Sequence, residues 1–410
     1  MRSALVAVLL ASSLLWAAQR PKPPRVLIIT NANVVDVRYG TILPNSTIVI
    51  KDGVIEAIAK IAAIDSGSNV RVVNAGGQYV IPGLWDMNAH LSAPASDHQS
   101  LYSSYLSSGV IGLREPGKGD DRIQLVDGLL LKGPHDSLGE VLPYLHSAFP
   151  APTLPEQRTI EGVDDVLLAC SSKENELRNK RTTAEPQEEQ DPLDPPAVPI
   201  AKEVRSTYDP QKAQDLFIRI SNHATWMVPG LVSIEAPIAQ LSDEDWDSVR
   251  DPFSIKFSRA QLGELVEKKT EFERARLLVH DMRQSGVHFL AGTNGPRENV
   301  PPGRSLHREL ELLVRSGLSP LDALRSATFN AALYIAKLNK YGVVEAGHVA
   351  DLVLLDGNPG EDITQLDKIT GVVMDGKYFS RTELDRLAAP SLHSFRETKT
   401  AAVPTPQSAQ

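Results

Sequence analysis

The sequence predicts an α/β protein, with parallel strands and helices in the middle of the chain and a small β domain built from both ends. Strand and turn signals fill residues 26–79, and similar β-rich runs return near the other end. Between them, short apolar runs alternate with segments of helical periodicity, which is the pattern of βα units.

The small β domain is expected to combine residues 26–81 with residues 341–380. The runs Ser46–Ile50 and Val54–Ile58 are rich in β-branched residues and flank an Asp-Gly turn, which indicates a hairpin. Ala350–Leu355 is a strand of the same texture. Neither end has enough strands to cover its own apolar face, so we expect one β-sandwich made from both.

Residues 82–340 are expected to form the βα layer. Val287–Gly292 is a candidate buried strand, and Leu306–Val314 places its apolar side chains on one face of a helix. The next helix is expected to begin at Ser319 as its cap, with Pro320 at its first position. These elements predict a parallel sheet covered by helices.

Two segments are expected to lie outside the packed domains. Residues 171–199 are dominated by Glu, Lys, Arg, Gln and Pro, which predicts an exposed excursion from the barrel. Residues 388–410 have a similar composition and predict a disordered tail.

Residues 1–19 have the features of an export signal. Arg2 gives a positive start, Ala4–Leu15 is an uncharged apolar run, and the small residues Ala17 and Ala18 precede the expected cleavage point. The alternative is an uncleaved membrane anchor, for which the apolar run is short. A cleaved signal predicts a periplasmic or extracellular protein with no membrane span.

Composition restricts the classes of function. Of the 410 residues, 42% are apolar and 23% are charged, which is typical of a soluble globular protein. A net charge of −9 argues against a nucleic-acid partner, because such a partner needs a basic surface. The single cysteine, Cys170, excludes an intramolecular disulfide and a Cys-rich zinc module. Any metal must therefore be held by His, Asp, Glu or Lys.

The most informative motif is the segment Val80–Leu91, which contains a Pro-Gly turn and then the pair Asn88-x-His90. Two polar residues separated by one position point to the same face of a strand. At the carboxyl end of a barrel strand, that face is where ligands and catalytic groups lie. Two histidines at these positions would form a metal clamp, but here the first is asparagine.

This segment resembles the amidohydrolase superfamily, in particular its imidazolonepropionase and Xaa-dipeptidase-like branch, where it usually reads I-P-G-L-W-D-M-H-x-H. The resemblance continues through Ala291–Gly295, which is similar to the strand-eight A-G-T-D motif. It extends to Pro302–Leu310, Ser319–Thr328 and Gly342–Pro359, which follow in the order that the family shows. The collinear set is far more specific than any one motif.

The resemblance implies a metal-dependent-hydrolase-type (β/α)8 TIM barrel that holds one or two divalent ions, often zinc. In the family the ligands are two His of strand one, a carboxylated Lys of strand four, one His each of strands five and six, and an Asp of strand eight. That Asp also acts as general base toward the metal-bound water, and the water attacks the carbon of an amide or related group. Amides, imidazolones and dipeptide-like compounds are the substrates that the resemblance implies.

Carried over to this chain, most of the ligand set is absent. Asn88 stands at the first strand-one position, while His90 stands at the second and can still bind a metal. Asn294 stands at the position of the strand-eight Asp, where an amide can neither accept a proton from water nor supply negative charge. The run Thr159–Gly162 resembles the strand-six motif and puts Gly162 where its His belongs.

The region of strands four and five shows no counterpart of the family Lys or of the strand-five His. We therefore expect an incomplete barrel. The ligand candidates that remain there are Lys132, His135 and His146, of which His146 is better explained as a surface residue.

Two further residues are candidates for binding a substrate. Arg114 ends the predicted second strand at the barrel mouth, where it would bind a carboxylate or, as the alternative, form an ion pair at the rim. His307 stands at a helix start that is expected to face the mouth, where it would contact the substrate or serve a structural role.

Three hypotheses follow from the sequence. The first is a metal-dependent hydrolase of carbon–nitrogen bonds, with zinc or another divalent ion held by His90 and substitute ligands. The second, which the residues favour, is a non-catalytic exported protein that binds a small molecule or short peptide and holds no metal. The third is a decaying gene product whose shortened barrel leaves unpaired strand edges.

Overall fold

The computed structural model describes residues 26–60, 70–90, 98–116, 122–125, 142–143, 159–183, 201–239, 241–242 and 258–388. The expected signal at 1–19 and nearly all of the expected tail lie outside these ranges. Lys132, His135 and His146 lie outside them as well. Within the described ranges, no helix is both long and apolar enough to cross a membrane.

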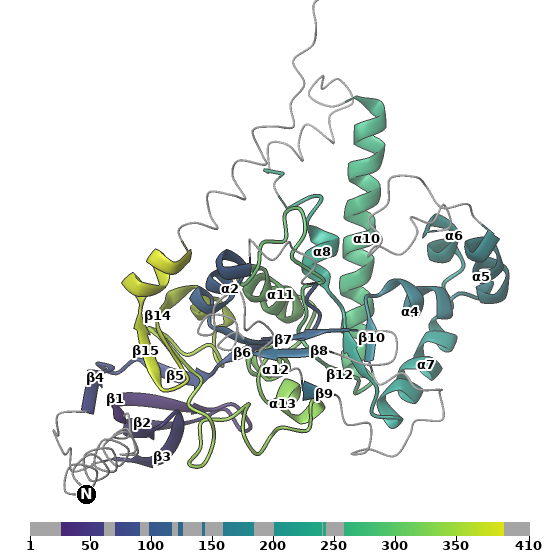
Figure 1. Ribbon diagram of the computed structural model, residues 1–410. Coiled ribbons are helices and arrows are strands. Elements are labelled where there is room, and N and C mark those ends of the chain that lie inside the picture. Colours follow the sequence, from purple (N-terminus) through teal and green to yellow (C-terminus); the bar gives the residue numbers. More distant parts are fainter. Residues whose placement is uncertain are drawn as a thin grey trace, which may run out of the picture.

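Strands from both ends of the chain lie in one eight-stranded sheet (Figure 1). Its order is β15-β14-β13-β5-β1-β2-β3, with β4 paired to β1. The strands are β1 (Val26–Asp36), β2 (Thr41–Lys51), β3 (Val54–Ala59), β4 (Val70–Asn74), β5 (Tyr79–Pro82), β13 (Leu352–Leu355), β14 (Ile369–Met374) and β15 (Lys377–Ser380).

Two features explain how this sheet forms: a tight turn, and a strand pairing between the two ends of the chain. Asp52 and Gly53 both have positive φ, which suits the tight turn of the β2–β3 hairpin that the sequence predicts. Farther along the chain, β5 pairs antiparallel with β13, and Ile81 lies opposite Val353. The two chain ends are thus joined by a strand ladder. Division of these strands into two packed sheets stays a prediction.

The second part of the fold is a parallel layer. β6 (Leu84–Asp86) pairs parallel with β7 (Val110–Glu115), and β10 (Thr159–Glu161), β11 (Trp226–Val228) and β12 (His288–Phe289) also pair parallel. The segment after β12 runs beside the end of β6, through a parallel bridge between Ala89 and Gly295. The parallel order is therefore β7, β6, β12 with its extension, β11 and β10.

Two short strands depart from this parallel order. β8 (Arg122–Leu125) pairs antiparallel with β7, and β9 (Leu142–Pro143) pairs antiparallel with β8. Of the described strands in this layer, β6, β7, β10, β11 and β12 pair in parallel, whereas β8 and β9 pair antiparallel. That the barrel is incomplete stays a prediction, because much of residues 117–158 lies outside the described ranges.

The helices that the structure describes are α2 (His98–Ser107), α4 (Asp164–Ala169), α5 (Glu174–Thr183), α6 (Ala201–Ser206), α7 (Pro210–Asn222), α8 (Leu231–Glu235), α10 (Arg259–Gln284), α11 (Arg304–Arg315), α12 (Pro320–Ser326) and α13 (Phe329–Tyr334), with the 3-10 helix η2 (Ile363–Lys368). Most of them share one apolar core with the parallel strands, whereas α5 and α6 bury Leu177 and Val204 in a separate small cluster beside α4.

Capping residues explain where several helices begin. Ser319 accepts a hydrogen bond from the backbone N–H of Asp322 and Pro320 is the first residue of α12, as the sequence predicts. Ser258 and Gln261 form a capping box at the start of α10. Within the expected excursion, α5 exposes most of its side chains, and Leu177 is buried.

Trp85 of β6 packs closely against Gly112 of β7, and this contact gives a test of the packing. A methyl group on Gly112 would lie 2.3 Å from the Trp85 ring, so Gly112→Ala should lower the free energy of unfolding by about 1–3 kcal/mol. The matched control is Gly263→Ala in α10, where no atom lies within 4 Å and a gain of about 0.5–1 kcal/mol is expected. Equal effects in chemical denaturation would contradict the placement of Trp85.

Candidate functional site

His90 and Asn294 meet at the carboxyl end of the parallel layer. The Nε2 atom of His90 lies 2.7 Å from Oδ1 of Asn294, and because an amide oxygen only accepts, the ring nitrogen is the donor. The backbone N–H of His90 also donates to the carbonyl of Gly295 at 2.7 Å. Asn294 has φ of 54°, a left-handed conformation that asparagine tolerates better than most residues.

Asn88 lies beside this pair and is 3% exposed. Its carbonyl accepts from the backbone N–H of Asn294 at 2.8 Å. Its Oδ1 atom is buried without a hydrogen-bond partner among the described residues. Only glycine fits at position 292, because a Cβ there would lie 2.6 Å from the Cβ of Asn88. The fold thus brings together Asn88, His90 and Asn294, which we call the mouth triad.

Asp86 holds the two segments of the mouth triad together, and the sequence reasoning missed it. Its carboxylate accepts from the Thr293 hydroxyl at 2.7 Å and from the backbone N–H groups of Thr293 and Asn88 at 3.0 and 3.2 Å. Burial raises the pKa of Asp86 to about 6, and these hydrogen bonds oppose the increase. An acidic residue inside the apolar run Val80–Met87 was the available signal.

Arg114 lies near the end of β7, as expected. The carboxylate that it contacts is a side chain of the protein itself. Its Nη2 atom lies 2.9 Å from Glu161 and 2.8 Å from the Thr159 hydroxyl, both on β10. Nη1 donates to the carbonyl of Met87 at 2.8 Å. The Arg114 side chain is 1% exposed and forms an ion pair with Glu161. A role for Arg114 in binding substrate stays a prediction.

Gly162 follows β10 at the position where the family resemblance implies a lost histidine. Its backbone N–H donates to the carbonyl of Val228 at 2.8 Å, and its φ is 75°. No heavy atom lies within 4 Å of the place where its Cβ would be. The position therefore has room for a side chain but offers no metal ligand.

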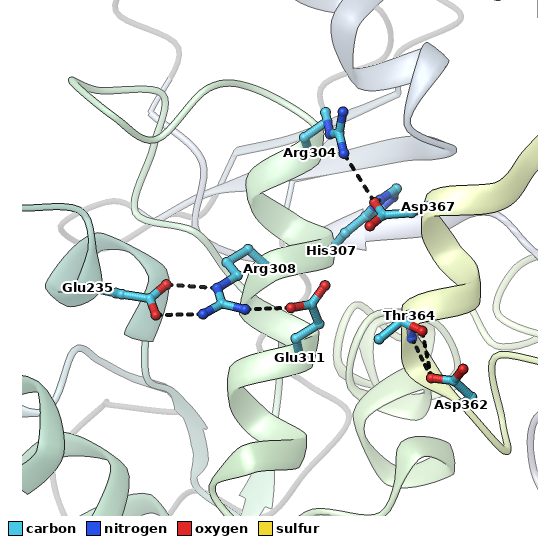
Figure 2. A network of polar contacts seen from close by, with 8 residues as sticks. All are labelled: Glu235, Arg304, His307, Arg308, Glu311, Asp362, Thr364 and Asp367. Atoms are coloured by element: carbon cyan, nitrogen blue, oxygen red, sulfur yellow. Dashed lines mark hydrogen bonds and ion pairs between the residues drawn. The ribbon is translucent and has the colours of Figure 1, made fainter. Parts of the chain in front are cut away.

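His307 lies on α11 in a polar network with η2 (Figure 2). Its Nε2 atom is 2.8 Å from the carbonyl of Ser108, and its Nδ1 atom is 3.4 Å from Asp367. The hydrogen bond to His307 lowers the pKa of Asp367, with a further contribution from Arg304. These contacts give His307 a structural role between α11 and η2, and its expected contact with substrate stays a prediction.

The mouth triad does not fit a tightly held divalent metal ion. Zinc sites use three or four strong donors, whereas the triad has one imidazole and two neutral amides. The Nε2 atom of that imidazole is engaged with Asn294. No cluster of three His, Cys, Asp or Glu side chains suited to a metal occurs within the described ranges. Metal-assisted activation of water therefore requires ligands beyond the mouth triad.

A second buried acid, Glu309, is hydrogen-bonded to a segment that packs against Asn294. Glu309 on α11 is fully buried, and its Oε2 atom accepts from the backbone N–H of Val232 at 2.7 Å. That bond fixes the turn that contains Gly230, which lies against Asn294: a Cβ on Gly230 would be 3.5 Å from that of Asn294. Burial raises the pKa of Glu309 to about 8, so it holds a proton at neutral pH.

This raised pKa predicts a pH dependence of stability. The folded-state pKa of about 8 exceeds the reference value of 4.5, so stability is highest below about pH 4.5 and falls as pH rises toward 8. Glu309→Gln should remove this loss and stabilise the protein at pH 8 by a few kcal/mol, at about 1.4 kcal/mol per pKa unit. The measurement is denaturant unfolding from pH 5 to 9, with the exposed Glu298→Gln as control. Parallel pH profiles for the three proteins would refute the assignment.

The chain is similar to several known proteins. Residues 264–378 match the model of the Amidohydrolase family. Adenine deaminase from Desulforamulus reducens is 27% identical over 350 residues, which are 81% of this chain and 55% of that protein. The chain thus spans about half the length of this relative. Ochratoxinase from Aspergillus niger is 34% identical over 101 residues, 23% of this chain and 20% of that protein.

A solved amidohydrolase structure gives the comparison of folds. It has a TM-score of 0.54 and 19% identity, and the match covers 87% of this chain and 99% of that one. The chain therefore shares the fold of that structure, which agrees with the predicted TIM barrel, whereas metal dependence and the particular branch stay predictions. Residues 264–378 thus resemble the Amidohydrolase family, and the chain has the fold of a solved amidohydrolase.

Proposed function

We propose that this protein binds a small molecule with an amide-like carbon–nitrogen group at the mouth triad and does not hydrolyse it. The hydrogen bond between His90 and Asn294 carries the proposal, because it engages the one imidazole of the triad with a neutral amide. The same amide cannot act as the general base that attack by water requires.

The class of ligand follows from the groups that the triad offers. The buried Oδ1 atom of Asn88 is an acceptor without a described partner, so a ligand N–H group would satisfy it. His90 and Asn294 are partly exposed and add an imidazole and an amide that bond to neutral polar groups. Neutral amides, imidazolones and dipeptide backbones all combine N–H and C=O groups. Residues 1–19 add the proposal that binding takes place outside the cytoplasm.

Hydrolysis of a carbon–nitrogen bond is the second candidate function. The names of the relatives favour it, since an adenine deaminase matches over 81% of this chain. It requires additional metal ligands beyond the mouth triad, for which Lys132, His135 and His146 are the sequence candidates. A role for them is open to direct measurement of bound metal.

Metal content and ligand binding on the unaltered chain test the proposed function. We expect far less than one zinc, iron, cobalt or manganese ion per chain by elemental mass spectrometry. We also expect a rise in melting temperature with adenine, an N-acyl amino acid or a dipeptide, without product formed. Asn88→Asp should remove the rise only if the ligand contacts this side chain. Stoichiometric metal, with turnover that a chelator abolishes, would establish the second candidate instead.

Restoring two family ligands should not restore hydrolysis. The double variant Asn88→His/Asn294→Asp regains an imidazole and a carboxylate, but the lysine and two further histidines of the family set remain absent. We expect no zinc-dependent turnover of the same compounds above the level of the unaltered chain. Measurable recovery would mean that other residues of the chain already supply the missing ligands.

A further inference from the structure

Asn294 is followed by Gly295, and this is the single Asn-Gly pair among the 410 residues. The backbone nitrogen after an asparagine can attack the carbon of the side-chain amide, and glycine hinders that attack least because it lacks a Cβ. The fold requires glycine at 295, since a Cβ there would lie 2.8 Å from Cγ1 of Val300. The packing thus keeps an unhindered nucleophile next to the Asn294 amide.

The Gly295 nitrogen is connected to a buried base. Its N–H donates to the Thr293 hydroxyl oxygen at 3.2 Å, and that hydroxyl donates to the Asp86 carboxylate at 2.7 Å. Thr293 is 2% exposed and Asp86 is fully buried. A hydroxyl that both accepts and donates can pass the proton of the nitrogen on to the carboxylate. Asp86, acting through Thr293, is therefore placed to activate the attacking nitrogen.

His90 contacts the group that is attacked. Its Nε2–H donates to Oδ1 of Asn294 at 2.7 Å, and that oxygen gains negative charge when a nucleophile adds to the amide carbon. A hydrogen-bond donor fixed at such an oxygen stabilises the intermediate. Both side chains are partly exposed, which gives water access to the product of the attack. A nucleophile, a base relay and a donor thus converge on one amide of the protein itself.

We propose that Asn294 is a self-modification site, at which the side-chain amide of the protein's own asparagine is hydrolysed. The Gly295 nitrogen forms a bond to Cγ of Asn294, and its proton leaves through Thr293 to Asp86. The bond from Cγ to Nδ2 then breaks, and Nδ2 takes up a proton and leaves as ammonia, so that no proton is gained or lost overall. Water opens the resulting succinimide at either carbonyl and gives aspartate or isoaspartate.

The modification changes the chemistry of the mouth triad. It replaces the Nδ2 donor of Asn294 by a carboxylate oxygen and adds a negative charge beside His90. The isoaspartate product also inserts an extra carbon atom into the backbone before Gly295. The reaction needs no bound ligand, so it is independent of the proposed function and goes beyond it.

Comparison of the folded with the unfolded chain tests whether the fold activates this asparagine. The unaltered protein is incubated at neutral pH with and without urea, and conversion of Asn294 is followed by peptide mass spectrometry, with Asn294→Asp as the product standard. We expect conversion at least about tenfold faster in the folded chain, because acid–base assistance is lost on unfolding. Asn45, which is exposed, has φ of 51° and precedes Ser46, is the internal reference and should not be faster when folded.

Two variants test the relay and the donor separately. Thr293→Val removes the hydroxyl relay with little change of shape, and His90→Leu removes the donor to Oδ1. Each should slow conversion of Asn294 in the folded chain at least about tenfold. His90 is partly exposed, so His90→Leu is expected to fold even where Thr293→Val does not, and circular dichroism checks both. The matched control is Thr364→Val, which removes an exposed hydroxyl–carboxylate contact to Asp362 (Figure 2) and should leave the rate unchanged.

Two results would overturn the proposal. One is conversion of Asn294 that is no faster in the folded chain than in urea, relative to Asn45. The other is an unchanged rate of conversion in every folded variant of Thr293 and His90. Release of ammonia in step with the conversion would confirm that the side-chain amide is the bond that breaks.

Discussion

Asp86 anchors the functional end of the molecule. Three hydrogen bonds reach its buried carboxylate, from the backbone N–H groups of Asn88 and Thr293 and from the Thr293 hydroxyl. Because an unsatisfied buried carboxylate would be very unfavourable, these donors must stay in place for the fold to be stable. The end of β6 and the segment after β12 are thereby fixed side by side, and the mouth triad lies on these two segments.

The interactions that hold the barrel mouth in shape are distinct from the triad side chains that would contact a ligand. Backbone hydrogen bonds join Asn88 to Asn294 and His90 to Gly295, and the close contact at Gly292 excludes any larger residue. None of these interactions requires a metal ion. Side chains of the triad can therefore be neutral amides without loosening the segments that carry them. A barrel mouth that keeps its shape is compatible with chemistry other than metal-assisted hydrolysis.

Local signals in the sequence predicted much of the fold. The Asp52-Gly53 turn and the Ser319 cap depend on residues close together in the chain, and both occur as expected. The family motifs predicted that Asn88, His90 and Asn294 would be neighbours. The pairing of Asp86 with Thr293 spans 207 positions and has no local signal. His307 shows the limit of helix periodicity, which gives an apolar face but not the element that covers it.

The balance of charge at the mouth favours the proposal of a maintained site over that of a decaying one. Substitution at random would leave buried charges without partners, which destabilises a fold strongly. Here Arg114 is paired with Glu161, Asp86 is hydrogen-bonded on both oxygens, and burial keeps Glu309 protonated at neutral pH. Asn294 contributes no negative charge at the position where the resemblance implies a carboxylate that binds a metal cation. Among the described residues, the mouth offers neither a full set of metal ligands nor their charge, yet its buried charges are compensated, which supports the proposal of a stable binding protein.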